Sequence, residues 1–316
     1  KKTIKSIFNS NHRKILQMNS LPTDPHVLFN PTIHKLLPIP VALFYALTLL
    51  ISYKIFPCPE KLNPKNNKGK RVADYHRLYN NYPSILHSIV ISVYGIWYSC
   101  NYEITYGQKS DMWACIGMLN TFGYFIYDTI AAETLFKYDW AMRLHHVCGI
   151  LLFGGSYLTG ISCSEITFGV AIIELANPFN LYREIMKKWD EENTDKYFKV
   201  SLTFAALFIF SRFVVWPFQL AQLYPSRAPL FFKLYIAGGW MISCHWLFMI
   251  INFASKEFKK RDDTKGGFAQ TFYNACVGLR KNKLFLYGYY AVATYLAFGT
   301  LYQSHPSDAI STTEIF

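Results

Sequence analysis

The sequence predicts an all-α integral membrane protein, a bundle of about seven or eight transmembrane helices. Hydrophobic residues make up 52% of the chain and charged residues only 16%, whereas soluble domains carry about a quarter charged residues. The apolar residues stand in long runs, and Tyr and Trp gather at the ends of these runs. Aromatic rings settle at these positions because the ends of a span meet the membrane interface. One membrane domain without a soluble appendage accounts for this composition.

The first segment, residues 1–35, is a basic leader that predicts an amphipathic helix. Ile4, Ile7 and Phe8 fall on one helical face, opposite Lys5 and Arg13. An amphipathic helix on the membrane surface and a mitochondrial targeting segment both fit this pattern. An ordinary solvated tail is the alternative. The choice between a functional leader and a solvated tail stays open.

Eight apolar runs follow the leader, each a candidate for a membrane span. The first run and the basic loop after it form the segment 36–73, and the segment 257–316 is a linker with an extra C-terminal transmembrane helix. The fourth run is short for a full crossing, so its helix is expected to begin nearer Trp140. The runs cover approximately residues 36–56, 84–100, 112–127, 146–158, 166–181, 200–224, 230–253 and 284–301.

The distribution of Lys and Arg predicts the orientation of the bundle. Loops 57–83, 128–144, 183–199 and 254–283 hold 21 of these residues, and the alternate loops 101–111, 159–165, 223–233 and 302–316 hold 3. The basic loops should face the cytoplasm or matrix, and the leader then falls on the opposite side or the first run does not cross. The net charge of +12 is therefore interpreted as charge facing anionic lipid and not as a nucleic-acid surface.

Ionisable side chains at the predicted membrane depth are the main functional signal. Each is costly there unless it is paired or hydrated, so these side chains should face the interior of the bundle. They indicate a polar interior or a cavity, and the alternative is that they only hold the helices in register. The residues are His87, Asp128, Glu133, His145, His146, Glu174, Arg212 and His245.

The densest group of these residues is Asp128, Glu133, Arg143, His145 and His146. Consecutive residues of a helix point about 100° apart, so the two histidines cannot face the same partner. We expect one imidazole to address a cavity and the other to bond a carboxylate or the neighbouring helix.

A second polar group predicts a kinked helix. Glu174 and Asn177 are three residues apart and share a helical face, and Pro178 should break the helix just beyond them. Such a helix suits the wall of a polar pocket. The histidines do not follow the spacing of metal-binding His boxes, and the seven cysteines form no CxxC pair, so we expect no metal, no disulfide framework and no cofactor.

Several stretches in order resemble the TLC domain family, which includes ceramide synthases and translocation-associated membrane proteins. They are the segment HRLYNNYPSILHSIVISVYGIW with His87, then Tyr124 and Asp128, then His145-His146, then IELANPF, and finally WMISCHWLFMIINF with His245. The spacing is similar to the TLC domain-containing protein 4 branch, and the similarity covers residues 74–256. The resemblance implies a TLC-type bundle with a lipid-accommodating cavity. It implies lipid contacts for His87, Tyr124, Asp128, His145, His146, Glu174, Asn177 and His245.

The chain departs from the ceramide synthases at the position that carries their chemistry. Those enzymes are expected to place a His-Asp pair where this chain has Ile173-Glu174, and a further Asp where it has Asn177. Isoleucine is neither a general base nor an acyl acceptor. The sequence therefore favours a protein that binds or handles membrane lipid without ceramide synthase activity.

Two alternatives remain open. One is a lipid acyltransferase that uses His145 or His146 as the base, oriented by Asp128 or Glu174. The other is an accessory subunit of a large membrane complex, such as a mitochondrial respiratory or ATP synthase assembly, which docks through the leader and the C-terminal segment. The mitochondrial inner membrane and the endoplasmic reticulum are equally compatible locations, and membrane lipids are the expected partners.

Overall fold

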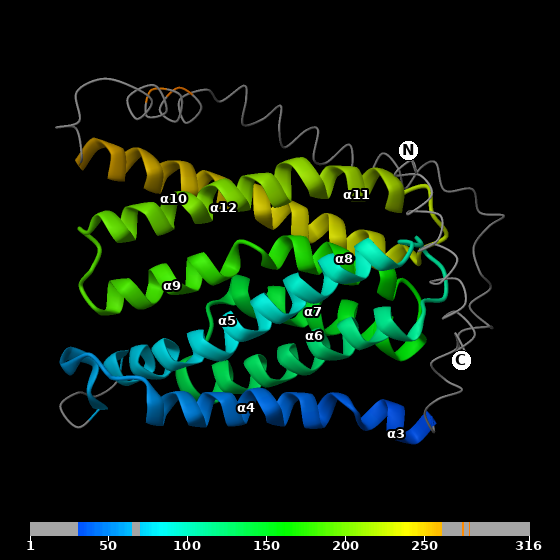
Figure 1. Ribbon diagram of the computed structural model, residues 1–316, viewed down its shortest axis with the longest axis horizontal. Helices are drawn as coiled ribbons and strands as arrows, with labels where there is room; N and C mark the ends of the chain where they lie inside the picture. Colours follow the sequence, from blue (N-terminus) through cyan, green and yellow to red (C-terminus); the bar gives the residue numbers. More distant parts are fainter. Residues whose placement is uncertain (1–30, 65–69, 261–273, 275–277, 279–316) are drawn as a thin grey trace, which may run out of the picture.

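The protein is described by a computed structural model that covers residues 31–64 and 70–260, together with residues 274 and 278. Every regular element among these residues is a helix, and the helices run side by side along the long axis of the molecule (Figure 1). An isolated β-bridge joins Lys109 to Ile161. Most of the predicted leader and the helix predicted at 284–301 lie outside the described residues.

The N-terminal part consists of α3 (Pro31–Leu36), α4 (Pro38–Ile55), the short η1 (Glu60–Leu62) and the long helix α5 (Lys70–Asn101). The prediction of a loop over 57–83 is wrong from Lys70 onward, because α5 begins well before its apolar run. Ahead of its apolar run, α5 buries the polar side chains of Asn80, Asn81 and Ser84. A prediction from runs of apolar residues therefore does not recognise this part of the chain as a helix.

The middle of the chain forms two helices of similar length. Helix α6 (Met112–Ala131) ends in a π-helical turn, η3 (Ala132–Phe136), and α7 (Trp140–Thr159) follows. The predicted start near Trp140 is confirmed. Asp139 sets this start because its side chain accepts a hydrogen bond from the Met142 amide at 2.9 Å, and Asp111 caps α6 through the Ala114 amide.

The fifth apolar run forms two helices and not one. Helix α8 (Cys163–Glu174) ends before Asn177, earlier than predicted, and α9 (Asn177–Lys188) begins with Pro178 in its first turn. Proline is accepted at a helix start but not in a helix interior, because it has no amide hydrogen. The predicted break near Pro178 is present, but it lies before Asn177, so Glu174 and Asn177 belong to different helices and do not share one helical face.

The C-terminal part of the described chain packs on the other side of the bundle from α4 (Figure 1). Helix α10 (Asp195–Ile209) continues through a π-helical turn, η4 (Phe210–Val215), into α11 (Trp216–Leu223), and α12 (Leu230–Lys260) runs back beside them. Among the described residues, three helical segments are long and apolar enough to cross a membrane: His34–Ile55, Asp195–Leu223 and Leu230–Ile251.

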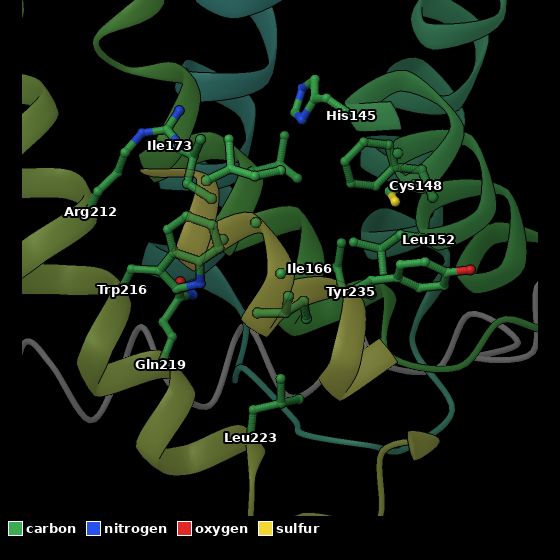
Figure 2. A pocket seen from close by; sticks show the side chains of 18 of the residues that line it. His145, Cys148, Leu152, Ile166, Ile173, Arg212, Trp216, Gln219, Leu223 and Tyr235 are labelled. Carbon is green, nitrogen blue, oxygen red and sulfur yellow. The ribbon is translucent and has the colours of Figure 1, made fainter. Parts of the chain in front are cut away.

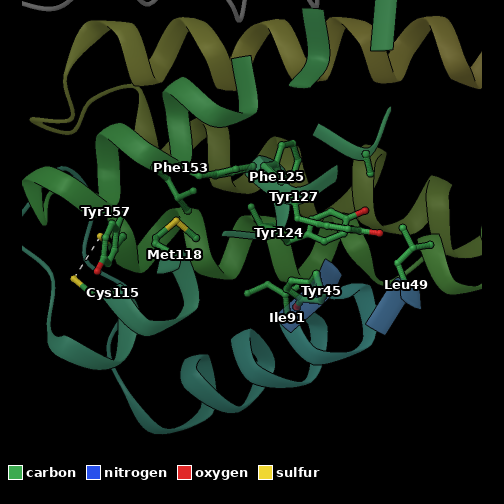
Figure 3. Close-up of a cluster of buried hydrophobic side chains, with 14 of the residues drawn as sticks. Tyr45, Leu49, Ile91, Cys115, Met118, Tyr124, Phe125, Tyr127, Phe153 and Tyr157 are labelled. Carbon is green, nitrogen blue, oxygen red and sulfur yellow. Dashed lines mark hydrogen bonds between the residues drawn. The ribbon is translucent and has the colours of Figure 1, made fainter. Parts of the chain in front are cut away.

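The core is divided into one large and two small clusters. The large cluster packs α4 to α8 together around Tyr45, Ile91, Met118, Tyr124 and Phe153 (Figure 3). One small cluster joins α11 to α12 through two tryptophans and their neighbours, and the other joins α10 to α12. Their buried members include Trp216, Leu220, Trp240 and Cys244 in the first, and Phe204, Phe208 and Ile250 in the second.

The loops gather at the two ends of the bundle. Lys61 in η1 pairs with Asp190 in the α9–α10 turn, and Lys188 pairs with Asp74 at 2.9 Å. These contacts bring two of the predicted basic loops to the same end. The bridge between Lys109 and Ile161 joins the loops at the opposite end, so the arrangement agrees with the alternation read from the charges.

Candidate functional site

A cavity of about 500 Å³ lies between α7, α8, α11 and α12 (Figure 2). This volume falls within the range of small-molecule sites. Most of its wall is apolar, with Leu152, Ile166, Ile173, Trp216 and Tyr235 among the lining residues. The cavity lies between the large core cluster and the two small clusters of the C-terminal helices.

Ionisable side chains stand at one end of this cavity. His145 comes from α7, Glu174 from the last residue of α8, and Arg212 from the π-helical turn η4. Figure 2 shows His145 and Arg212 at the same end, and Leu223 at the other. The lining therefore has a polar end and a mostly apolar wall, which suits an amphiphilic molecule.

Glu174 is positioned by side chains from two other helices. Its Oε2 accepts a hydrogen bond from Ser88 Oγ of α5 at 2.7 Å and another from Asn177 Nδ2 of α9 at 2.7 Å. The expected proximity of Glu174 and Asn177 is therefore present. Asn177 holds the carboxylate in place and does not itself line the cavity.

Arg212 is buried, with 5% of its surface exposed. Its Nη1 donates a hydrogen bond to Ser243 Oγ of α12 at 2.7 Å, and its guanidinium carbon lies 4.7 Å from the Phe208 ring centre and 5.4 Å from that of Trp246. The aromatic faces stabilise the cation in an apolar setting. No carboxylate of the described residues lies within ion-pair distance of it.

The two consecutive histidines point into different environments, as their angular separation requires. His145 lines the cavity, with its ring centre 6.0 Å from that of Trp246. His146 points toward α6 instead: its Nε2 lies 3.3 Å from Asp128 Oδ2, and its Nδ1 lies 3.2 Å from Thr129 Oγ1. Only His145 is available to a molecule in the cavity.

Asp128 is the centre of a closed polar cluster between α5, α6 and α7. Asn80 Nδ2 donates to its Oδ1 at 2.6 Å, and Tyr138 Oη donates to its Oδ2 at 2.7 Å. Tyr127 Oη extends the cluster by donating to Asn80 Oδ1 at 2.7 Å. Every partner of this carboxylate is a neighbouring side chain, so the cluster ties helices together and does not face the cavity.

The remaining predicted lipid contacts lie elsewhere. His87 stacks on Tyr124 with ring centres 3.9 Å apart, and Tyr45 packs against both rings in the large core cluster. Neither His87 nor Tyr124 lines the cavity. The backbone of His245 belongs to α12, but its side chain lies outside the described residues.

The prediction that Glu133 faces the interior is wrong. Glu133 lies in the turn η3, and its side chain is 44% exposed where it forms an ion pair with Arg143 at 2.7 Å. The π-helical turn moves this residue beyond the end of the buried part of α6. The densest ionisable group in the sequence is thus split three ways: Asp128 and His146 are buried together, Glu133 and Arg143 form an exposed pair, and His145 lines the cavity.

Two polar residues of the cavity were not singled out as site residues from the sequence. Glu165 opens α8 and accepts a hydrogen bond from the Gly107 amide at 2.8 Å, and Gln219 of α11 stands against Gly169. An uncharged amide within an apolar run is a weak signal, and Glu165 lies at the edge of a run. Among the described residues, no group of three or more His, Cys, Asp or Glu side chains could hold a metal ion.

Comparison with known families agrees with this helical membrane architecture. The model of the TLC domain matches residues 78–255, more than half of the chain. The chain belongs to the TLC-domain family. No match was found among curated proteins or among solved structures. All the cavity-lining residues, from Tyr106 to Trp246, lie within the TLC domain.

Proposed function

We propose that this TLC-domain protein binds a membrane lipid, with the acyl chain in the cavity between α7, α8, α11 and α12. The proposal includes a bundle of about seven or eight transmembrane helices. It also includes membership of the TLC domain-containing protein 4 branch. The observation that carries it is the distribution of polar groups in the lining: the wall is mostly apolar, interrupted by Glu165 and Gln219, and His145, Glu174 and Arg212 gather at one end. A lipid headgroup would bind the polar end, and its acyl chain would lie along the apolar wall.

The dimensions of the cavity support a single chain. At a rise of about 1.5 Å per residue, the wall between Arg212 and Leu223 is about 16 Å long. Trp216 and Gln219 line it between these two residues. A wall of this length suits an extended acyl chain better than a compact polar ligand.

The proposal excludes ceramide synthesis because of the residue at one position. Ile173 lines the cavity where the resemblance places a catalytic histidine. An isoleucine side chain has no group that accepts a proton or an acyl chain. The protein would then influence membrane lipid by binding it.

The test is to fill the cavity and measure bound lipid. Gly238 lines the cavity, and a Cβ added there meets no atom within 4 Å. We expect the full chain, purified in mild detergent, to carry a lipid species enriched over the bulk membrane, as measured by extraction and mass spectrometry. Gly238→Phe should remove this enrichment because the ring would occupy the space of the chain.

Gly238→Ala is the matched control. It also replaces the glycine by a better helix former but adds only a methyl group, so the lipid should remain bound. If the wild-type protein returned only lipid of bulk composition, or if Gly238→Phe retained the enriched species, lipid binding in this cavity would be excluded.

A lipid acyltransferase is the second candidate, and the position of His145 favours it. The His145 ring lines the cavity and makes no hydrogen bond with a described residue, so it is free to act on a ligand. The carboxylate best placed to orient a histidine, Asp128, contacts His146 instead. The test is to measure whether the protein consumes acyl-CoA in the presence of a panel of lipid acceptors. Unchanged activity in His145→Ala would exclude His145 as the base.

The accessory-subunit hypothesis rests on segments that lie outside the described residues. Native gels in mild detergent test it, because a small free species would contradict it. Cell fractionation distinguishes the mitochondrial inner membrane from the endoplasmic reticulum.

A further inference from the structure

Arg212 has more hydrogen-bond donors than the surrounding protein uses. A guanidinium carries five N–H donors and cannot lose its charge at ordinary pH. One nitrogen, Nη1, donates to Ser243, and the buried Nε has no partner among the described residues. A buried donor without an acceptor is costly, so the side chain is incomplete as it stands.

The neighbouring groups do not make up this deficit. Glu174 lines the same cavity, but it forms no ion pair with Arg212, and its Oε2 already accepts from Ser88 and Asn177. The aromatic rings around the guanidinium supply only their faces. Arg212 therefore keeps donors that no described side chain uses, and an acceptor-rich, anionic group in the cavity would satisfy them.

We infer that the cavity selects a single-chain amphiphile with an anionic headgroup, bound by the guanidinium of Arg212. This inference rests on the proposed lipid binding and adds the class of ligand. The headgroup would accept hydrogen bonds from the free nitrogens of Arg212, while the chain lies along Trp216 and Ile166 toward Leu223. A fatty-acid carboxylate and a lysophospholipid phosphate share the required chemistry.

The test compares each anionic ligand with a neutral ligand of the same chain, on the purified full-length protein. The pairs are oleate against oleyl alcohol, and oleoyl lysophosphatidate against monooleoylglycerol, each titrated below its critical micelle concentration. We expect the anionic member of at least one pair to bind about tenfold more tightly or better, the value for a charge-assisted hydrogen bond. The pair with the larger preference identifies the headgroup as carboxylate or phosphate.

Arg212→Gln should abolish this preference and leave the affinity for the neutral ligand nearly unchanged. Arg143→Gln is the control, because it makes the same substitution at an exposed arginine outside the cavity. If Arg212→Gln does not fold, Gly238→Phe replaces it, and the anionic preference should then disappear together with binding.

The outcomes separate the inference from the function on which it rests. Equal affinity for anionic and neutral ligands in the wild-type protein, with binding lost in Gly238→Phe, overturns the headgroup inference alone. A preference that persists in Arg212→Gln or in a filled cavity also overturns it. If no ligand binds, both the inference and the proposed function fail.

Discussion

At the residue scale, the most informative pair is His145 and His146, adjacent in sequence but different in setting. The His145 ring is turned to the cavity, and His146 is 4% exposed between Asp128 and Thr129. Neighbouring residues of a helix face different directions, so one pair of identical side chains serves two purposes. The structure assigns the cavity to the first histidine and the contact between helices to the second.

This difference in setting predicts that the same substitution will affect stability at His146 and ligand binding at His145. His146→Leu should lower the free energy of unfolding by about 1–3 kcal/mol, because it removes a partner from the buried Asp128. His145→Leu should leave thermal stability nearly unchanged and alter the affinity for amphiphiles. Thermal unfolding in detergent and a ligand titration measure the two effects.

Tyr138→Phe also removes one hydrogen bond to Asp128 and leaves the cavity unchanged. It is therefore the control that shows how much stability the loss of a single partner of Asp128 costs. A result in which His145→Leu destabilises the protein as strongly as His146→Leu would contradict the assignment.

At the scale of elements, helices α5 and α8 approach closely at small residues. A Cβ on Gly95 would collide with the Cβ of Ala171 and lie 2.9 Å from the Thr167 carbonyl oxygen. Ser92 Oγ, one turn earlier, donates to the Ala171 carbonyl at 3.0 Å across the same contact. Small residues and hydroxyl groups are typical of helix contacts within membranes. This contact holds the cavity wall α8 against the core.

Gly95→Ala should therefore destabilise the protein although alanine favours helices. Overpacking of this kind costs about 1–3 kcal/mol, and the thermal unfolding midpoint should fall. Gly155→Ala is the matched control in α7, because its added Cβ would lie 3.4 Å from the Phe232 ring, an ordinary contact. Equal midpoints for the two variants would contradict the close packing of α5 on α8.

The elements also show where prediction from sequence succeeds and where it stops. The start of α7 and the break before α9 follow from local chemistry, a capping Asp139 and a Pro178 that cannot lie inside a helix. The start of α5 was missed because the helix is polar ahead of its apolar run and buries in its third turn the amide of Asn80, whose acceptor Asp128 is distant in sequence. The π-helical turns have no such local signal, and they decide where Glu133 and Arg212 point.

At the scale of the whole molecule, the alternation of loops between two ends carries the membrane interpretation. The ion pairs of Lys61 and Lys188 hold two basic loops together at one end, and the bridge at Lys109 marks the other. Anionic lipid favours the basic end on the cytoplasmic or matrix side.

The orientation can be measured with a membrane-impermeant thiol reagent on sealed vesicles whose cytoplasmic or matrix face is inside. Glu192 lies in the α9–α10 turn and Gln108 in the loop at the opposite end, and both are exposed. We expect Gln108→Cys to gain labelling above the native cysteines in intact vesicles, and Glu192→Cys to gain it only after permeabilisation. Equal labelling of both in intact vesicles would contradict the orientation.

The same scale explains which site residues the sequence could and could not indicate. The cost of charge in a membrane correctly predicts that Asp128, His146 and Arg212 lie inside the bundle. It does not say which interior space each one faces, because that depends on the packing of helices distant in sequence. His87, Tyr124 and His146 thus lie in packed surroundings, whereas His145 and Glu174 line the cavity.

The division of the core into three clusters has a consequence for the length of acyl chain that the cavity can hold. The cavity is lined by Phe125 and Phe153 of the large cluster, by Trp216 of the α11–α12 cluster, and by Trp246, which packs against the α10–α12 cluster. If α10, α11 and α12 slid slightly as one body, both small clusters would stay packed, and only Phe232 of α12 would have to move in the large cluster for the space to lengthen or widen. A cavity between clusters that can shift in this way would accept acyl chains of several lengths. The protein would then select its ligand by the headgroup and not by the length of the acyl chain.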